Sequence, residues 1–154
     1  MYKGTILAAL LCLGIQTEGL AQPKIKVACI GNSITVGATI SNLEVNSYPA
    51  QLQVLLGDGY EVRNFGQNST TVQTHGRDRD DATEKYAYRK QEKYQQAKAF
   101  NPDIIIIKLG TNDSKECNWH EDSPSVFAND LKDMLDDLQT LPSKPKIYLC
   151  FRCA

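Results

Sequence analysis

The stretch IKVACIGNSIT, residues 25–35, decides the fold of this 154-residue chain. Its first six residues form an apolar run that predicts a buried parallel strand. A glycine follows at once, and the turn after it presents Ser33 at the carboxyl end of the strand. Ligands bind open α/β sheets at that edge. A single serine in such a turn is also typical of a helix cap, so other motifs have to separate the two interpretations.

Two later stretches end in the same way. Residues 60–65 (YEVRNF) predict a second strand that ends at Gly66. Residues 103–109 (DIIIIKL), the most β-branched run in the chain, predict a third strand that ends in the turn 110–113 (GTND). We expect the three turns to meet at one edge of the sheet. A serine there could attack a carbonyl carbon if a base takes its proton and hydrogen-bond donors receive the oxyanion.

These three blocks, in this order and each after a strand, resemble the SGNH/GDSL hydrolase family of esterases and lipases. The resemblance implies a flavodoxin-like, three-layer α/β/α fold with a parallel sheet. It implies that Ser33 is the nucleophile and that the Ser33 amide, the Gly66 amide and the Asn112 side chain hold the oxyanion. Asn32 stands where the commonest form of the first motif has aspartate, which keeps a short polar side chain in the turn. Residues 47–52 (SYPAQL) also resemble carbohydrate-esterase-like bacterial members.

The base of this reaction is not found in the sequence. A serine nucleophile needs a histidine oriented by a carboxylate, and the family carries this pair near its C-terminal end as Asp-x-x-His. The chain has two histidines, and Val72 and Cys117 stand three positions before His75 and His120. The base histidine and its aspartate are therefore absent from this chain. We expect an SGNH domain that is incomplete at its C-terminus, through truncation, a frameshift or a partial sequence.

The resemblance thus predicts an exported serine esterase that removes acyl groups, including acetyl groups from carbohydrate, with its catalysis crippled by the missing block. Two alternatives stay open. His120 could serve as the base from its loop at the catalytic edge. Alternatively, the chain is a non-catalytic remnant or a module that binds a small ligand or a sugar without turnover.

The first 21 residues have the pattern of a secretory signal peptide. Lys3 supplies the positive charge, residues 6–15 form a short apolar region, and residues 19–21 (GLA) form a small-x-small cleavage site. We therefore expect the hydrolase domain to occupy residues 22–154 and the protein to be secreted or periplasmic. No other stretch is long and apolar enough to predict a membrane span.

Composition narrows the class of partner. A net charge of −1 predicts no broad attraction to nucleic acid, and 42% hydrophobic and 23% charged residues are ordinary for a globular domain. The flavodoxin-like order raises the alternative of a flavin-binding module. The first turn has only one glycine, however, whereas loops that bind phosphate through backbone N–H groups are glycine-rich. Cys117, His120 and Asp122 could be metal ligands, yet a closed zinc site needs four. We predict no cofactor and no metal, and a small-molecule or carbohydrate ester as substrate.

The remaining chain alternates helices and strands, as a parallel sheet requires. We expect helices at residues 47–56, 86–100 and 123–141 and a fourth strand at residues 146–150, with Cys29 and Cys150 in core strands. The polar run from residue 70 to residue 84 predicts a solvated face that could line the mouth of the site.

Overall fold

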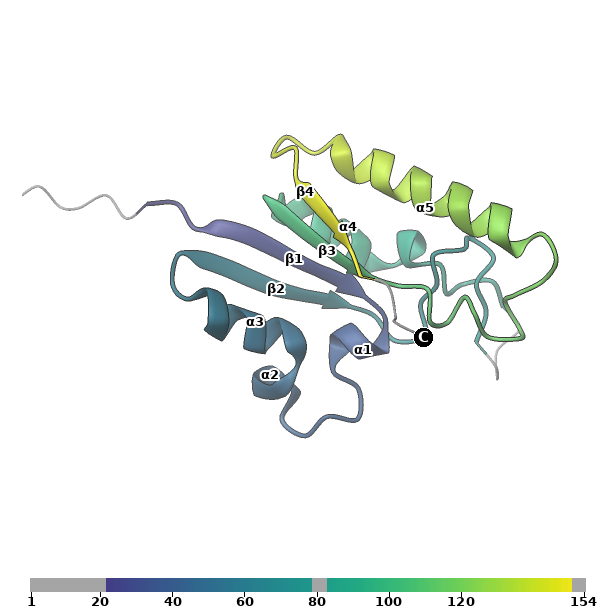
Figure 1. Cartoon of the computed structure of the whole chain (residues 1–154), viewed down its shortest axis with the longest axis horizontal. Helices are drawn as coiled ribbons and strands as arrows, with labels where there is room; N and C mark the ends of the chain where they lie inside the picture. The colour runs from purple at the N-terminus through teal and green to yellow at the C-terminus, as the bar shows by residue number, and fades with distance from the viewer. Residues whose placement is uncertain (1–21, 79–82, 151–154) are drawn as a thin grey trace, which may run out of the picture.

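The computed structural model describes residues 22–78 and 83–150, so the predicted signal peptide lies outside the described residues (Figure 1). A parallel four-stranded sheet in the order β2-β1-β3-β4 runs through the centre of the fold. Its strands are β1 (Ile25–Gly31), β2 (Tyr60–Gly66), β3 (Ile104–Lys108) and β4 (Lys146–Leu149). The predicted strands and the parallel α/β class are confirmed, and each strand end differs from its prediction by at most one residue.

Helices cover the sheet on both faces, which makes three layers (Figure 1). The connection from β1 to β2 carries α1 (Ser33–Val36), α2 (Leu43–Asn46) and α3 (Tyr48–Leu56). The opposite face carries the 3-10 turn η1 (Tyr88–Lys90), α4 (Glu92–Phe100) and α5 (Ser123–Gln139). In the described part of the chain, no helix is long and apolar enough to cross a membrane.

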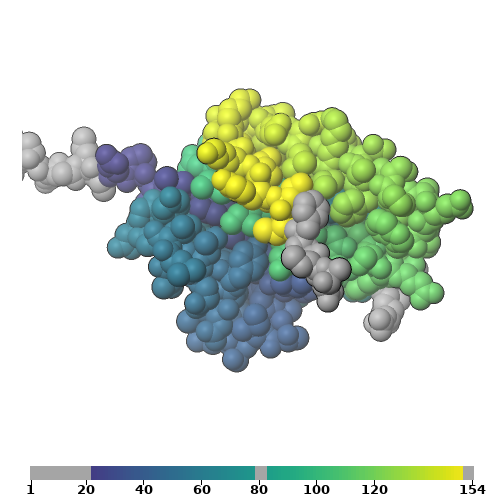
Figure 2. All heavy atoms as spheres, in the orientation of Figure 1, coloured from purple at the N-terminus to yellow at the C-terminus, as the bar shows by residue number. Residues whose placement is uncertain are grey.

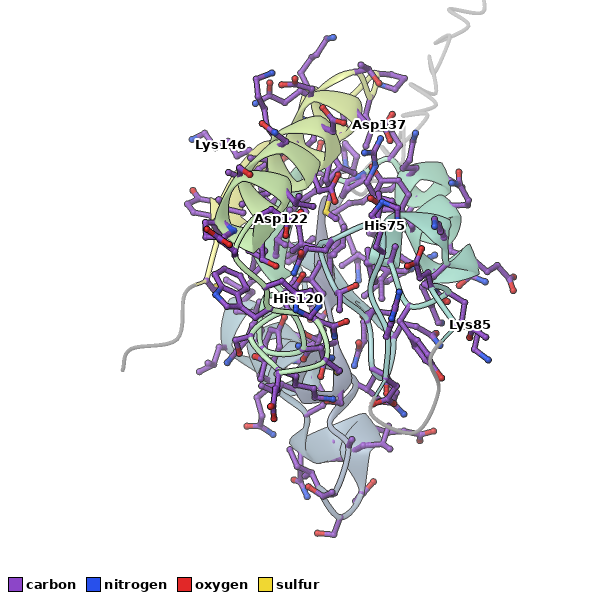
Figure 3. All side chains as sticks on the ribbon, turned by 90° about the vertical axis from the view of Figure 1, so that its right-hand side faces the viewer. His75, Lys85, His120, Asp122, Asp137 and Lys146 are labelled. Carbon is purple, nitrogen blue, oxygen red and sulfur yellow. The ribbon has the colours of Figure 1, made fainter. Side chains whose placement is uncertain are left out.

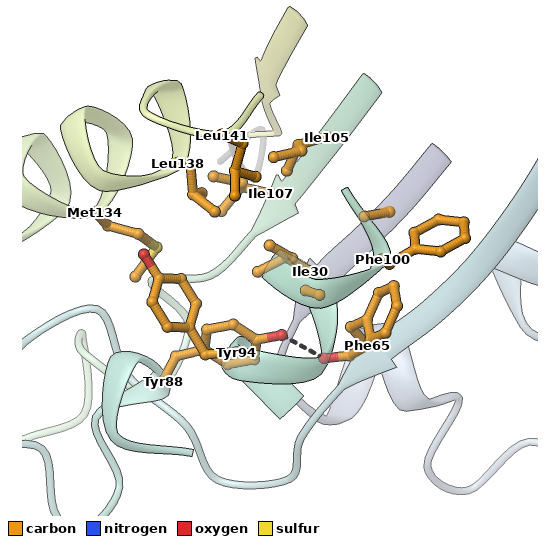
Figure 4. Packing of buried hydrophobic residues seen from close by; sticks show 12 residues of the cluster. Ile30, Phe65, Tyr88, Tyr94, Phe100, Ile105, Ile107, Met134, Leu138 and Leu141 are labelled. Atoms are coloured by element: carbon orange, nitrogen blue, oxygen red, sulfur yellow. Dashed lines mark hydrogen bonds between the residues drawn. The ribbon is translucent and has the colours of Figure 1, made fainter. Parts of the chain in front are cut away.

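The main core lies between the sheet and the pair α4 and α5 (Figure 4). Ile30, Ile105 and Ile107 alternate along β1 and β3 and turn fully buried side chains to this face. The hydroxyl of buried Tyr88 donates to the Phe65 carbonyl at 2.6 Å, which ties η1 to the end of β2. The helices contribute Tyr94, Ala97, Phe100, Met134 and Leu138 to the same cluster.

The strand order places a topological switch between β1 and β3. The connection after β1 runs over one face of the sheet, whereas the connections after β2 and β3 run over the other. Ligands bind open α/β sheets in the crevice at such a switch, outside the carboxyl ends of the strands. Gly31 pairs with Gly66 on one side and with Lys108 on the other, so the three motif-bearing turns begin side by side.

The side chain of Gln53 forms hydrogen bonds with backbone groups on the outer edge of β2. Gln53 of α3 accepts a hydrogen bond from the Val62 N–H at 2.7 Å and donates to the Tyr60 carbonyl at 3.1 Å. It also donates to the Gly57 carbonyl at 3.0 Å, where α3 ends. These backbone groups of an edge strand would otherwise be free to pair with another chain.

Three details correct the sequence prediction. The helix expected from residue 86 begins later, because Thr71 bonds to the backbone of Tyr86 and Tyr88 and holds this segment extended. Residues 43–46, where no helix was predicted, form the single turn α2. Cys150 follows β4 and is exposed, since β4 lies at the surface of the molecule beside α5 (Figure 2). Cys29 is buried in β1, as predicted.

Candidate active site

Ser33 is the first residue of α1, directly after the carboxyl end of β1. Asn32 caps this turn: its side chain accepts from the Ile34 N–H at 3.1 Å, and its carbonyl accepts from the Thr35 and Val36 N–H groups. Within the described part of the chain, no hydrogen bond engages the Ser33 hydroxyl, and the side chain is partly exposed. Because Asn32 does the capping, the Ser33 hydroxyl remains available for chemistry.

Two glycines let α1 approach the sheet closely. A Cβ atom on Gly31 would clash with the Thr35 side chain and lie 2.7 Å from the Lys108 carbonyl oxygen. A Cβ atom on Gly66 would lie 2.5 Å from the Val36 nitrogen. The backbone of the serine turn therefore packs directly on the ends of β1 and β2.

The Gly66 amide, assigned by resemblance to the oxyanion, already has a partner. It donates to Asn64 Oδ1 at 2.9 Å, and Asn64 Nδ2 in turn donates to the Thr35 carbonyl at 2.7 Å. An oxyanion would have to replace or share Asn64 Oδ1 as the acceptor. The oxyanion role of Gly66 stays a prediction, while its close contact with α1 is a property of the fold.

Asn112 lies in the turn after β3 and is 5% exposed. Its Nδ2 donates to the Thr70 carbonyl at 2.9 Å, which joins this turn to the loop after β2. A carboxamide has two N–H bonds, so one can still serve another acceptor. The place of Asn112 beside the topological switch suits the predicted oxyanion role, which stays a prediction.

Asp113 is a positioning residue that the sequence analysis missed. It is fully buried, and its carboxylate accepts from the Val72 N–H at 3.0 Å and from the Gln73 N–H at 2.9 Å. Burial raises the pKa of the Asp113 carboxyl, and these backbone N–H groups oppose the rise. The carboxylate holds the loop after β2 against the turn that carries Asn112. Its partners lie 40 and 41 residues away, so no local pattern in the sequence revealed it.

The polar run from residue 70 to residue 84 is only partly the solvated face that was predicted. Its first four residues, Thr70 to Gln73, are buried. Asn118, buried in the loop after β3, bonds through its side chain to both the N–H and the carbonyl of Arg77, at 2.8 and 2.9 Å. Buried side chains from another loop supply the hydrogen bonds that water was expected to supply.

The two histidines differ in their partners. His120 lies on the exposed loop before α5, and its backbone N–H donates to Ser123 Oγ at 2.7 Å; in the described residues no carboxylate bonds to its ring. The Nδ1 atom of His75 lies 2.8 Å from Glu84 Oε2. Hydrogen bonds from Arg77 and then His75 lower the pKa of Glu84 to about 2. Sequence spacing did not indicate this pair, because its members lie nine residues apart in an irregular loop.

Two of the cavities formed by the described residues are lined by the loop after β3. One, of about 280 Å³, lies at the carboxyl end of β3, where Gly110 and Thr111 line it, and has mostly apolar walls, including Ile107 and Phe127. The other, of about 220 Å³, is polar and bordered by both histidines, but Ser33 does not line it. The metal site considered from the sequence does not form: across residues 22–78 and 83–150, no three His, Cys, Asp or Glu side chains could share an ion.

Comparison with known proteins gives a family and a curated relative for this chain. The GDSL-like lipase/acylhydrolase family matches residues 29–154. An acetylxylan esterase of Xylanibacter ruminicola is 39% identical over an alignment 158 residues long. The alignment covers 90% of this chain and 31% of that esterase. The chain therefore spans about a third of the length of this curated relative.

Solved structures show the same fold. AlinE4, an SGNH-hydrolase family esterase, superposes with a TM-score of 0.55 at 22% identity, over 82% of this chain and 58% of that one. A mutant of AlinE4 gives a TM-score of 0.54 with the same coverage and identity. The family match, which extends over most of the chain, and the sequence identity lead to one conclusion. The chain belongs to the GDSL-like lipase/acylhydrolase family.

Proposed function

We propose that this chain carries the nucleophile and the oxyanion donors of a serine carboxylic-ester hydrolase that acts on acetylated carbohydrate. The observation that carries the proposal is the Ser33 hydroxyl, which Asn32 frees from capping and which lies at the switch between β1 and β3. Family membership supports the reaction class, and the acetylxylan esterase relative supports the carbohydrate substrate. We propose in addition, from the N-terminal pattern, that the protein is exported.

The proposed reaction is acyl transfer in two steps. Ser33 Oγ attacks the ester carbonyl carbon, its proton passes to a base, and the carbonyl oxygen becomes an oxyanion. The Ser33 amide, the Gly66 amide and Asn112 Nδ2 are the proposed donors to that oxygen. The C–O bond to the alcohol then breaks, the alcohol leaves with a proton, and water hydrolyses the acyl-serine.

A second candidate function is ligand binding without turnover. It is favoured by the absence of any hydrogen bond between Ser33 and a histidine in the described residues. Loss of the histidine in serine hydrolases lowers turnover by on the order of 10⁶-fold. For a chain without that histidine, the esterase proposal therefore predicts slow acylation of Ser33 and slow hydrolysis of the acyl-serine, whereas ligand binding alone predicts neither.

The experiment is to incubate the protein with p-nitrophenyl acetate and to locate acetyl groups by peptide mass spectrometry. We expect acetylation of Ser33 that Ser33→Ala abolishes and that Ser125→Ala, a change on the exposed first turn of α5, leaves intact. His120→Ala tests the alternative base by its effect on the rate. Acetylation at other residues only, with release of nitrophenol unaffected by Ser33→Ala, would refute the esterase proposal and leave ligand binding.

A further inference from the structure

The apolar cavity of about 280 Å³ has no part in the reaction proposed above. The end of β3, the first half of α5 and the end of β4 all contribute to its walls. Six branched or aromatic hydrocarbon side chains line it: Val72, Ile107, Leu109, Phe127, Leu131 and Leu149. Lys108 is the only charged residue among the described residues that line it. The cavity therefore matches a ligand group that is apolar and uncharged.

The walls present apolar surface that the fold itself leaves partly uncovered. Leu109, Phe127, Leu131 and Leu149 are only partly buried, although each side chain is large and apolar. Leu109 and Leu149 pack against the main core, which includes Ile107, so these walls are anchored and the cavity is preformed. An apolar chain that entered it would cover this surface, and each buried methylene strengthens binding up to about fourfold.

The cavity lies next to the groups assigned to the reaction. Lys108 lines it and pairs with Gly31 of β1, two residues before Ser33. Neighbouring strands of a sheet are about 5 Å apart. Thr111 also lines the cavity and directly precedes Asn112. An ester whose carbonyl group meets Ser33 and Asn112 can therefore extend its acyl chain into this cavity.

The cavity is suited to binding and not to proton transfer. Among the described residues that line it, none is a histidine or a carboxylate. His75 and His120 instead border the polar cavity, on the side of the molecule that Figure 3 shows. The hydroxyl of Ser114, which lines the apolar cavity, donates to the Thr111 carbonyl at 3.0 Å. The acid–base step therefore has to take place outside this cavity.

The volume of the cavity limits the size of the group that fits. An apolar cavity of roughly 150 Å³ holds a benzene molecule, so about 280 Å³ accommodates six carbon atoms. The methyl group of an acetyl ester would leave most of this volume unfilled. We propose that this cavity is an acyl-binding pocket, which extends the acyl groups that Ser33 accepts from acetyl to unbranched chains of about six carbon atoms. The inference rests on the proposed function for the reaction at Ser33.

The first test compares the rates at which p-nitrophenyl hexanoate and p-nitrophenyl acetate acylate Ser33. In each reaction the acyl group moves to Ser33 Oγ and nitrophenol leaves with the serine proton. The release of nitrophenol that Ser33→Ala abolishes therefore measures acylation. At equal, low concentrations of ester, we expect the hexanoyl group to react at least roughly tenfold faster, since its four additional methylenes enter the pocket.

A matched pair of variants on α5 tests whether this preference comes from the cavity. Leu131→Trp fills the cavity, so the ratio of the two rates should fall to about one. Ala128→Trp adds the same ring at an exposed position of the same helix and should keep the ratio of the parent. Circular dichroism checks the folding of both variants. If Leu131→Trp unfolds, Ser114→Phe, at an exposed position that also lines the cavity, replaces it.

The second test measures binding without a reaction. The Ser33→Ala protein is titrated with sodium hexanoate and, in parallel, with sodium acetate, while NMR follows the amides of Gly110 and Thr111. We expect saturable shifts with hexanoate only, and their loss when Leu131→Trp is added.

Hexanoate binding without acylation of Ser33 by either ester would support the pocket and refute the esterase. Acylation of Ser33 at equal rates by the two esters, without saturable binding of hexanoate, would refute the pocket alone. An equal loss of the hexanoyl preference in folded Ala128→Trp and Leu131→Trp would also overturn the pocket.

Discussion

The serine turn after β1 and the two loops after β2 and β3 form opposite sides of the candidate site, and different forces position them. The serine turn is positioned by close backbone packing. Gly31 and Gly66 have no side chain, so α1 can lie directly on the strand ends. Buried polar groups position the loops, with Asp113 and Asn112 each bonded to backbone atoms of the loop after β2.

The difference has practical meaning for mutation. A sterically positioned element tolerates changes of nearby charge but not the addition of one methyl group. An element positioned by buried hydrogen bonds tolerates small changes of volume but not the loss of an acceptor. The two sides of the site should therefore be damaged by different substitutions.

Gly66→Ala should have the largest effect, because its new methyl group would lie 2.5 Å from the backbone nitrogen of Val36. We expect the free energy of unfolding to fall by about 3 kcal/mol, the upper part of the range for overpacking, as measured by urea denaturation. Gly59→Ala is the matched control, since nothing lies within 4 Å of its Cβ position. Equal stability of the two variants would contradict steric positioning of the serine turn.

Asp113→Asn should have a smaller effect of about 2 kcal/mol, because an amide NH₂ replaces one accepting oxygen and leaves buried backbone N–H groups poorly paired. Hydrogen exchange of the Val72 and Gln73 amides should accelerate with the loss of stability. Asp58→Asn, at an exposed position, is the control and should leave both quantities unchanged. Unchanged protection of the two amides in Asp113→Asn would show that the carboxylate does not hold the loops together.

The smallest effect concerns pH and the exposed part of the loop after β2. The pKa of Glu84 is lowered from 4.5 to about 2 by Arg77 and then His75. A carboxyl group whose pKa is lower in the folded state stabilises the fold above its ordinary pKa, and this contribution is lost as the pH falls from about 4.5 to about 2. NMR titration should show this low midpoint, and Arg77→Gln should raise it. Arg63→Gln, whose partner is Glu61, should leave it in place.

Much of the fold could be predicted from local sequence. The apolar runs that became β1, β2 and β3 are long and end in glycine or in a glycine-containing turn, so their boundaries were predicted almost to the residue. The same boundaries indicated where Ser33 and Asn112 would lie, because the carboxyl ends of parallel strands share an edge. The inward face of α4 also follows from helical spacing, since Tyr94, Ala97 and Phe100 recur every three residues and are all buried.

The contacts between loops could not be predicted. Asp113 and Asn118 each bond to groups about 40 residues away, and a polar residue in a turn has the same local pattern whether its partner is water or a distant amide. For the same reason the buried residues from Thr70 to Gln73 resembled a solvated run. The pairing of His75 with Glu84 depends on how an irregular loop folds back, which residue composition does not encode.

Gln53 makes the two edges of the sheet unequal in their capacity to pair with a further strand. Its side chain bonds to the Val62 N–H and the Tyr60 carbonyl. A further strand beside β2 could therefore not form hydrogen bonds with these two backbone groups. A strand added to the sheet is thereby directed to the far side of β4. One glutamine, remote from the serine turn, thus disfavours pairing of β2 with a strand of another chain and leaves β4 as the edge that can pair.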